Sequence, residues 1–327
     1  MNVNALISGF RKRKVFLVGD VMVDRFVFGT VSRISPEAPV PVIDVSDESD
    51  VPGGAANVAA VLGVSGARVF ASGVVGDDDA GRFLKSVLVK EGIDVKGFVV
   101  DGRRPTTLKT RVVAHSQHVV RFDRESVDEV GRVVEDRILR FFSRVVAGVE
   151  GVVVSDYCKG VVSPRFFERL LAVARKHGKV VVANTKAGNI LCFRGVDVLL
   201  VGLDEASLAS GIRPVNETSV RNMGNKIVSM LDCGSVVIMR GSLGFSVSGR
   251  DGSFVSVRAP DLGGMYEFRK TEDTALGFFA LGLFSGWSVV DAAKLSAYAV
   301  EVLASKANAS RITLEDLRKA FLAKPFG

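Results

Sequence analysis

Short β-branched runs alternate with longer amphipathic segments along most of this chain of 327 residues. Strands that are buried on both faces of a parallel sheet are short and mostly apolar, and helical crossovers must connect them. The alternation therefore predicts an α/β fold with a mainly parallel central sheet flanked by helices. The strands of this sheet are expected at residues 15–18, 68–74, 151–155, 179–183, 197–201, 236–239 and 245–247.

The segments between these runs show helical periodicity and helix-start signals. Ser163 followed by Pro164 is the clearest start, because serine caps a helix and proline is tolerated at its first position. Helices are expected at residues 55–62, 78–91, 125–146, 164–177, 273–285, 289–304 and 314–322.

Two segments do not fit the alternation. Residues 25–47 and 107–123 are rich in Val, Phe, Thr and Arg, follow a period of two and contain no helix between their strands. They predict a small antiparallel sheet, built from about residues 22–47 and 107–123 and inserted in a single domain of residues 1–327. A sheet of this kind, apolar on one face and outside the main core, serves as a lid or a dimer surface. We therefore expect a β lid and a homodimer formed through it.

Composition limits the class of protein. The apolar fraction of 47% is enough for a large core, but no apolar run approaches the ~20 residues of a membrane span. The basic start at residues 11–14 leads into an apolar run that Gly19-Asp20 interrupts, so a signal peptide is not expected. The three cysteines show no metal-binding spacing, which indicates free thiols in a reducing compartment. These features predict a cytoplasmic protein with no membrane partner.

The net charge of +7 suits a phosphorylated substrate, and a basic surface also attracts nucleic acid. However, the chain has no basic-aromatic stripe, no zinc-finger spacing and no arginine-rich tail. Nucleic acid is therefore not an expected partner.

A candidate ligand site begins at the end of the first strand. Asp20 follows that strand directly, and ligands of open α/β sheets bind at the carboxyl ends of the strands. Together with Asp24, it offers two carboxylates that can accept charge-assisted hydrogen bonds from vicinal hydroxyl groups. The alternative for an isolated Gly-Asp pair is that Asp20 only caps a turn.

The run Gly53-Gly54-Ala55-Ala56-Asn57 adds a second part to this site. Paired glycines let the backbone approach a ligand closely, and they open a helix whose first turn attracts anionic or polar groups. Asn57 lies on that first turn, where its amide can both donate to and accept from hydroxyl groups.

Together these motifs resemble the PfkB family of carbohydrate kinases, which have the ribokinase-like fold, in the order of elements over nearly the whole chain. Residues 19–25, 32–42, 52–59 and 106–111, with Gln117 and residues 121–123, are similar to the branch that phosphorylates O1 of D-glycero-β-D-manno-heptose 7-phosphate for lipopolysaccharide synthesis. The run at residues 35–41 favours this branch over an adenosine or ribose kinase. Bifunctional members carry a C-terminal adenylyltransferase domain, and none is expected here.

The resemblance implies a role for each matching residue. Asp20, Asp24, Gly53, Gly54 and Asn57 are expected to contact the sugar, and Asp273 is expected to be the base that deprotonates its hydroxyl. Lys109 and Arg111 are candidates for binding the 7-phosphate; the alternative for both is a solvated strand face. ATP is the expected co-substrate, with Mg²⁺.

The nucleotide side departs from the family pattern. The anion hole of these kinases reads D-x-x-G-A-G-D, whereas residues 267–273 read Glu-Phe-Arg-Lys-Thr-Glu-Asp, so both glycines are lost. Side chains obstruct the approach of phosphate to backbone amides, and Glu272 adds a carboxylate facing the γ-phosphate. The candidate nucleotide- or phosphate-binding residues are Lys186, Glu205, Arg240, Gly241, Gly244, Lys270, Thr271 and Glu272, with Glu205 also a candidate metal ligand.

These departures leave two hypotheses open. In the first, the chain is an active sugar-phosphate kinase that uses cations such as Lys186, Arg240, Arg269 or Lys270 in place of the glycine amides. In the second, it is an impaired kinase that still binds a sugar phosphate or acts as a dimer partner or scaffold.

Overall fold

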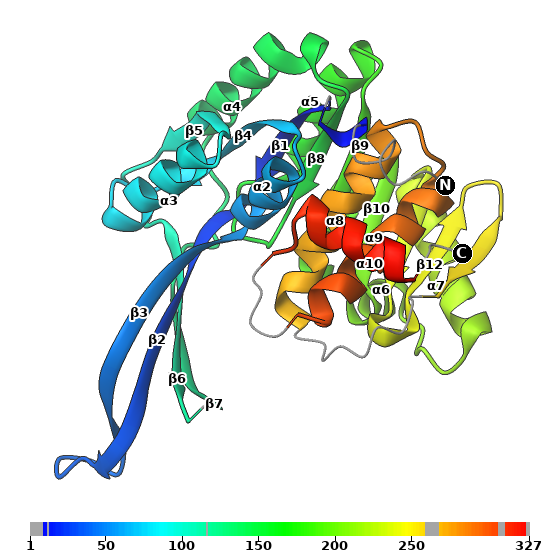
Figure 1. Cartoon of the computed structure of the whole chain (residues 1–327). Coiled ribbons are helices and arrows are strands. Elements are labelled where there is room, and N and C mark those ends of the chain that lie inside the picture. The colour runs from blue at the N-terminus through cyan, green and yellow to red at the C-terminus, as the bar shows by residue number, and fades with distance from the viewer. Residues whose placement is uncertain (1–8, 12, 116, 259–267, 307–310, 325–327) are drawn as a thin grey trace.

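The computed structural model describes residues 9–11, 13–115, 117–258, 268–306 and 311–324, with only the backbone described at residues 268–270. Its centre is a nine-stranded sheet in the order β13-β12-β11-β10-β9-β8-β1-β4-β5 (Figure 1). The strands are β1 (Lys14–Gly19), β4 (Arg68–Val75), β5 (Asp94–Val100), β8 (Gly151–Ser155), β9 (Val180–Asn184), β10 (Val198–Gly202), β11 (Ser235–Met239), β12 (Phe245–Gly249) and β13 (Phe254–Val257). All pairs from β11 to β5 are parallel, and β12 and β13 are antiparallel additions at one edge.

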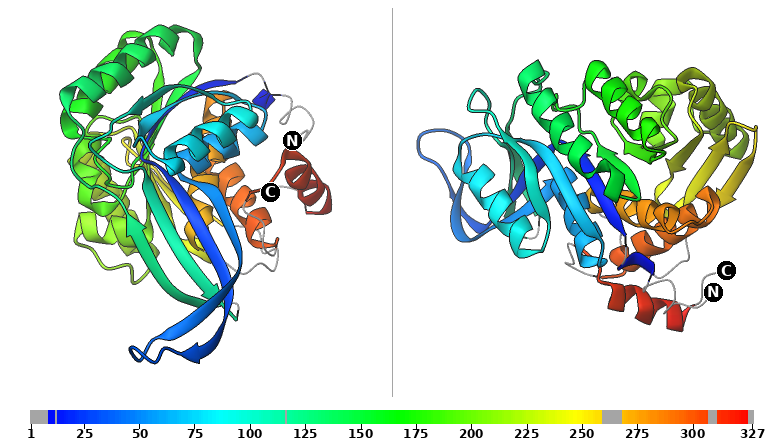
Figure 2. Two further views of the ribbon diagram at one scale, coloured as in Figure 1. Left: turned by 90° about the vertical axis from the view of Figure 1, so that its left-hand side faces the viewer. Right: turned by 90° about the horizontal axis from the view of Figure 1, so that it is seen from above.

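Helices cover both faces of this sheet (Figure 2). One apolar cluster packs the sheet against α2 (Ala55–Val64), α3 (Asp79–Lys90), α8 (Phe268–Phe284), α9 (Val289–Ala304) and α10 (Leu314–Ala323). A second cluster packs the other face against α4 (Arg132–Val145), α5 (Pro164–Lys176), α6 (Leu203–Ser210) and α7 (Glu217–Leu231). The predicted α/β fold with a mainly parallel sheet is confirmed.

Local chemistry sets where the helices begin. The Ser163 hydroxyl accepts the Phe166 N–H at 3.1 Å, which caps α5 as the sequence predicted. The helix predicted from residue 125 begins at Arg132 instead, because the Glu125 carboxylate is held at the end of the lid by two lysines. The helix predicted from residue 273 begins earlier, at Phe268, with consequences for the site.

The predicted lid is a four-stranded sheet in the order β3-β2-β6-β7. It consists of the antiparallel hairpins β2 (Val21–Ile34) with β3 (Pro41–Gly54) and β6 (Thr107–Ala114) with β7 (Gln117–Arg124), whose inner strands β2 and β6 pair in parallel. The sheet projects from the body as a long arm (Figures 1 and 2). Its strands leave the body at Gly19 and return at Gly54, next to the carboxyl edge of the main sheet.

Cys158, Cys192 and Cys233 are free, as their spacing predicted. Within the described ranges, none of the helices combines the length and the apolar character needed to cross a bilayer.

Candidate active site

Three strand ends meet at one edge of the main sheet and supply the floor of the site. β1, β8 and β9 lie side by side in parallel, so the segments that follow them emerge together. These segments contribute Asp20, Tyr157 and Lys186 respectively. The lid and the start of α8 close the same region from the other sides.

Asp20 organises the segment that follows β8. Its carboxylate accepts backbone N–H groups from Tyr157 at 2.7 Å, Lys159 at 3.0 Å and Val161 at 3.2 Å, and the residue is 1% exposed. Burial, and then the charge of Asp156, raise the pKa of Asp20, while the three N–H groups oppose that rise. Both carboxylate oxygens therefore accept hydrogen bonds from the backbone of this loop. This arrangement agrees better with the alternative that Asp20 caps a turn than with direct contact to a sugar.

Asp24 and the paired glycines form a second wall. The Asp24 carboxylate accepts from the Arg111 guanidinium at 2.5 Å. A Cβ on Gly53 would lie 2.6 Å from Asp24 Oδ2, so a larger residue at this position would displace the Asp24 carboxylate. Gly54 has a φ of 54° at the N-cap of α2, a left-handed conformation that favours glycine.

Asp273 lies at the centre of the site. The residue is 4% exposed, and its carboxylate accepts from Asn57 Nδ2 at 2.8 Å and from the Tyr157 hydroxyl at 2.7 Å. Burial raises the pKa of Asp273 to about 7, against the lowering effect of these two hydrogen bonds. A carboxylate with a pKa near neutrality suits general-base chemistry.

Asn57 is itself oriented by a residue that the sequence analysis did not single out. Arg311 Nε donates to Asn57 Oδ1 at 3.2 Å, and its Nη1 donates to both Glu91 carboxylate oxygens at 2.8 and 3.0 Å. Because Asn57 Oδ1 accepts from Arg311, the Nδ2 group of Asn57 is the part of the amide that points to Asp273.

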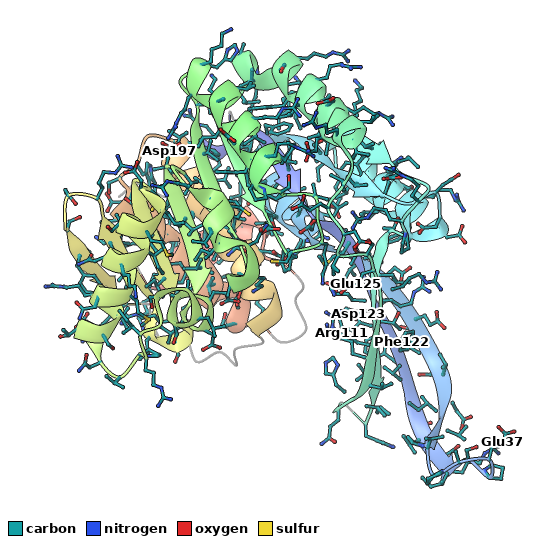
Figure 3. The ribbon with its side chains drawn as sticks, turned by 180° about the vertical axis from the view of Figure 1, so that it is seen from behind. Glu37, Arg111, Phe122, Asp123, Glu125 and Asp197 are labelled. Atoms are coloured by element: carbon teal, nitrogen blue, oxygen red, sulfur yellow. The ribbon has the colours of Figure 1, made fainter. Side chains whose placement is uncertain are left out.

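Lys109 and Arg111 are buried rather than solvated, at 9% and 6% exposure. Lys109 Nζ donates to Asp123 and to Glu125, both at 2.8 Å, and Figure 3 shows Arg111, Asp123 and Glu125 along the β6–β7 hairpin near the body. Lys159 completes the cluster, with Nζ 2.6 Å from Glu125. The solvated-face alternative is therefore wrong, because both cations are buried and paired with carboxylates.

The nucleotide side holds a compact charge cluster. Lys186 Nζ lies 2.7 Å from Glu272 and 3.1 Å from Glu205. Burial lowers the pKa of Lys186, but the two carboxylates outweigh it, so the net shift is upward. A Cβ on Gly202 would collide with the Glu205 carboxylate and lie 3.6 Å from Glu272 Oε1. Gly202 thus leaves the space that the two glutamates fill.

The start of α8 explains the altered turn. Because lysine and glutamate favour a helix by about 1 kcal/mol each over glycine, the helix extends back to Phe268. Only the first four N–H groups of a helix lack a partner, and Glu272 and Asp273 lie beyond them. The backbone here is helical instead of a nest of amides. Thr271 is half-buried in the same helix, and the side chains of Arg269 and Lys270 lie outside the described residues, as does all of Glu267.

Arg240 holds a turn. Its Nη2 donates to Ser256 Oγ at 2.7 Å and to the Leu243 carbonyl at 3.1 Å, which fastens the β11–β12 connection to β13. Gly241 and Gly244 have φ values of 58° and 79° in that connection. The guanidinium predicted as a phosphate clamp is thus already bonded to protein groups.

The described carboxylates of the site do not form a set that fits a resident magnesium ion. Among the residues described, no three His, Cys, Asp or Glu side chains gather closely enough to hold a metal. Glu205, the predicted ligand, is paired with Lys186.

Tyr157, Lys159, Glu125 and Arg311 were not predicted as site residues. Tyr157 and Lys159 had a usable signal, since Asp156-Tyr157-Cys158-Lys159 directly follows a buried parallel strand. Arg311 had none, because its contact with Asn57 spans most of the chain.

A nine-stranded α/β body, a β lid and a buried aspartate at the start of a late helix define the class of small-molecule kinases with a ribokinase-like fold. Within that class the chain belongs to the pfkB family of carbohydrate kinases, whose model matches residues 12–315.

Curated relatives and solved structures agree with this assignment. The chain is 36% identical to the bifunctional protein HldE of Geobacter metallireducens over 313 residues and 35% identical to that of a Caulobacter species, covering 95% of this chain in each case. It spans 64% and 63% of their lengths. By fold it is similar to phosphofructokinase-2 from Escherichia coli (TM-score 0.76, 17% identity, 95% of this chain and 98% of that one). The ribokinase of Arabidopsis thaliana with ribose and ATP is also similar (TM-score 0.74, 14% identity, 94% and 98%).

Proposed function

We propose that this chain is an ATP-dependent sugar kinase of the cytoplasm that phosphorylates O1 of heptose 7-phosphate, a precursor in ADP-heptose and lipopolysaccharide synthesis. The observation that carries the proposal is the buried Asp273 carboxylate, held between Asn57 and Tyr157 with its pKa raised to about 7. The identity with the HldE proteins supports the choice of heptose.

In the proposed reaction Asp273 accepts the proton of the attacking sugar hydroxyl. The Tyr157 hydroxyl occupies a hydrogen-bonding position on Asp273 that an alcohol donor would use, so the sugar hydroxyl replaces or joins it there. Lys109 and Arg111 bind the 7-phosphate by exchanging their carboxylate partners for its oxygens. ATP brings Mg²⁺ on its phosphates, which supplies charge neutralisation for phosphoryl transfer.

The test is release of ADP from Mg-ATP by the purified protein with heptose 7-phosphate. Asp273→Asn keeps the shape of the site but removes the base, so we expect a loss of at least a hundredfold in the rate of ADP release, on the scale of general-base catalysis. An unchanged rate in Asp273→Asn would contradict the proposed base, and absence of any release from the wild-type protein would contradict the kinase.

One observation favours the second candidate, an impaired kinase that retains sugar-phosphate binding. The Glu272 carboxylate lies 2.7 Å from Lys186 Nζ, where an oxygen of the phosphate would otherwise meet this cation. The helical start of α8 also leaves no nest of glycine amides beside it. Calorimetry separates the candidates: heptose 7-phosphate binding without binding of a non-hydrolysable ATP analogue supports impairment, and binding of both supports the active kinase.

We also propose a homodimer formed through the lid. Its support is the apolar surface that the arm exposes outside the core, including Phe28 at 37%, Val45 at 53% and Phe122 at 59% exposure. A two-stranded or four-stranded arm with such surface is stabilised by packing against a second copy.

A further inference from the structure

A cavity of about 170 Å³ lies between β5 and α4, away from the site described above. Its lining includes Lys96 from β5 and Arg137, Arg140 and Arg144 from α4, and it includes no acidic residue. Lys96 is the third residue of β5, near the amino edge of the parallel sheet, whereas the candidate active site follows the carboxyl ends of the strands. The cavity is therefore a separate site on the molecule.

The arginines of this cavity have no ion-pair partner among the described residues, although the charge of Asp136 acts on Arg140 from the same helix. Within the described part of the chain, Arg137, Arg140 and Arg144 make no ion pair or side-chain hydrogen bond. The two acidic side chains of α4 are used elsewhere: Glu135 pairs with Arg165 and Asp136 with Arg169.

Helix geometry makes the arrangement unfavourable without a ligand. Residues 137, 140 and 144 are spaced three and four apart, which places them on one face of α4. Like charges at this spacing repel one another. Lys96 from the neighbouring edge strand adds a fourth cation, 83% exposed, whose surface ion pair with Asp94 at 3.7 Å offsets its charge weakly. An anion bridging the guanidinium groups would remove that repulsion.

We propose that this cavity binds a compact anion carrying a diphosphate group, either free or borne by a nucleotide. A guanidinium group can bind two phosphate oxygens at once, and three arginines and one lysine line this cavity. The volume suits a diphosphate group and is smaller than the pockets that enclose whole drug-sized ligands. The floor is apolar: a Cβ on Gly97 would meet the Phe141 ring at 2.6 Å, so the ring lies directly against the strand.

Calorimetry with pyrophosphate at low ionic strength tests the proposal. We expect Arg140→Gln/Arg144→Gln to weaken pyrophosphate binding at least tenfold. We expect Lys226→Gln/Lys319→Gln, which removes the same charge at two exposed lysines elsewhere, to change it less than twofold. Lys186→Gln is expected to retain the binding, which keeps this site distinct from the kinase site and its proposed function. Equal losses in the two double variants, or no binding of pyrophosphate to the wild-type protein, would overturn the proposal.

A second arm repeats the titration with UDP. Loss of UDP binding in Arg140→Gln/Arg144→Gln identifies a nucleotide-borne diphosphate as a source, and binding of pyrophosphate alone identifies the free anion. Thermal unfolding checks the fold of the variant: removing two repelling charges is expected to leave the melting temperature equal or higher, while pyrophosphate no longer raises it. A variant that pyrophosphate still stabilises as it does the wild-type protein would refute the site.

Discussion

Replacing Glu272 by glutamine is expected to strengthen nucleotide binding. The carboxylate lies 2.7 Å from Lys186 Nζ, with the two side chains 24% and 33% exposed. Glutamine keeps the size of the side chain and the helix but removes the charge, so Lys186 keeps Glu205 as its one remaining carboxylate partner in this cluster and meets phosphate more readily. The change thus separates the electrostatic effect of Glu272 from the shape of the altered turn.

The size of the effect follows from Coulomb's law. Two like charges about 4 Å apart repel by about 1 kcal/mol in water and about 4 kcal/mol at an effective dielectric of 20. Because the Glu272 and Lys186 side chains are partly exposed, the lower part of this range applies, about 1–3 kcal/mol. That free energy corresponds to about a 5- to 150-fold gain in affinity.

The assay is calorimetric titration with a non-hydrolysable ATP analogue and Mg²⁺. Glu168→Gln is the matched control, because this exposed glutamate on α5 carries the same charge and forms no ion pair among the described residues. The gain is expected in Glu272→Gln alone. Equal affinity in Glu272→Gln and wild type, or an equal gain in the control, would refute the assignment of Glu272 as the anion that occupies the phosphate position.

Three further predictions concern the base, its support and the lid. Since burial raises the pKa of Asp273 above its unfolded value, its contribution to folding stability is present below about pH 4 and is lost as the pH rises through about 7. Asp273→Asn should therefore gain a few kcal/mol in the free energy of unfolding relative to wild type at pH 8 but little at pH 4; an equal difference at both would contradict the shifted pKa. Arg311→Gln frees the Asn57 amide to rotate, so the catalytic efficiency (kcat/KM) for the sugar should fall about tenfold. Arg318→Gln, which removes an exposed ion pair, should leave kcat/KM unchanged. Phe122→Ser is expected to give monomers in sedimentation analysis; dimers as stable as those of wild type would exclude this part of the lid from the interface.

Patterns that depend on local sequence were predictable. Burial on both faces leaves a parallel strand little choice but apolar β-branched residues, so the runs in β8 and β10 were identifiable. The hydrogen bond between Asn57 and Asp273 joins residues far apart in the chain, and only the resemblance to a family placed both in one site. Composition and periodicity alone do not predict that contact.

The rest required tertiary geometry. The backward extension of α8 follows from the loss of glycine, a signal that was present in the sequence but interpreted as obstruction of an open turn. Glu272 pairs with Lys186 in a space that Gly202 leaves open, and these three residues come from separate parts of the chain. Their contact therefore could not be predicted from local sequence. Similarly, Asp20 has no sequence signal that distinguishes a sugar ligand from an acceptor of three backbone N–H groups.

Hydrogen exchange at the backbone amides of Glu272 and Asp273 shows whether a helix has replaced an open nest of amides in front of the base. We expect these two amides to be protected at least tenfold in the ligand-free protein, since they lie beyond the first four N–H groups of α8. Exchange of both amides at the rate of an unstructured chain would contradict this expectation and indicate an open turn, ready for phosphate.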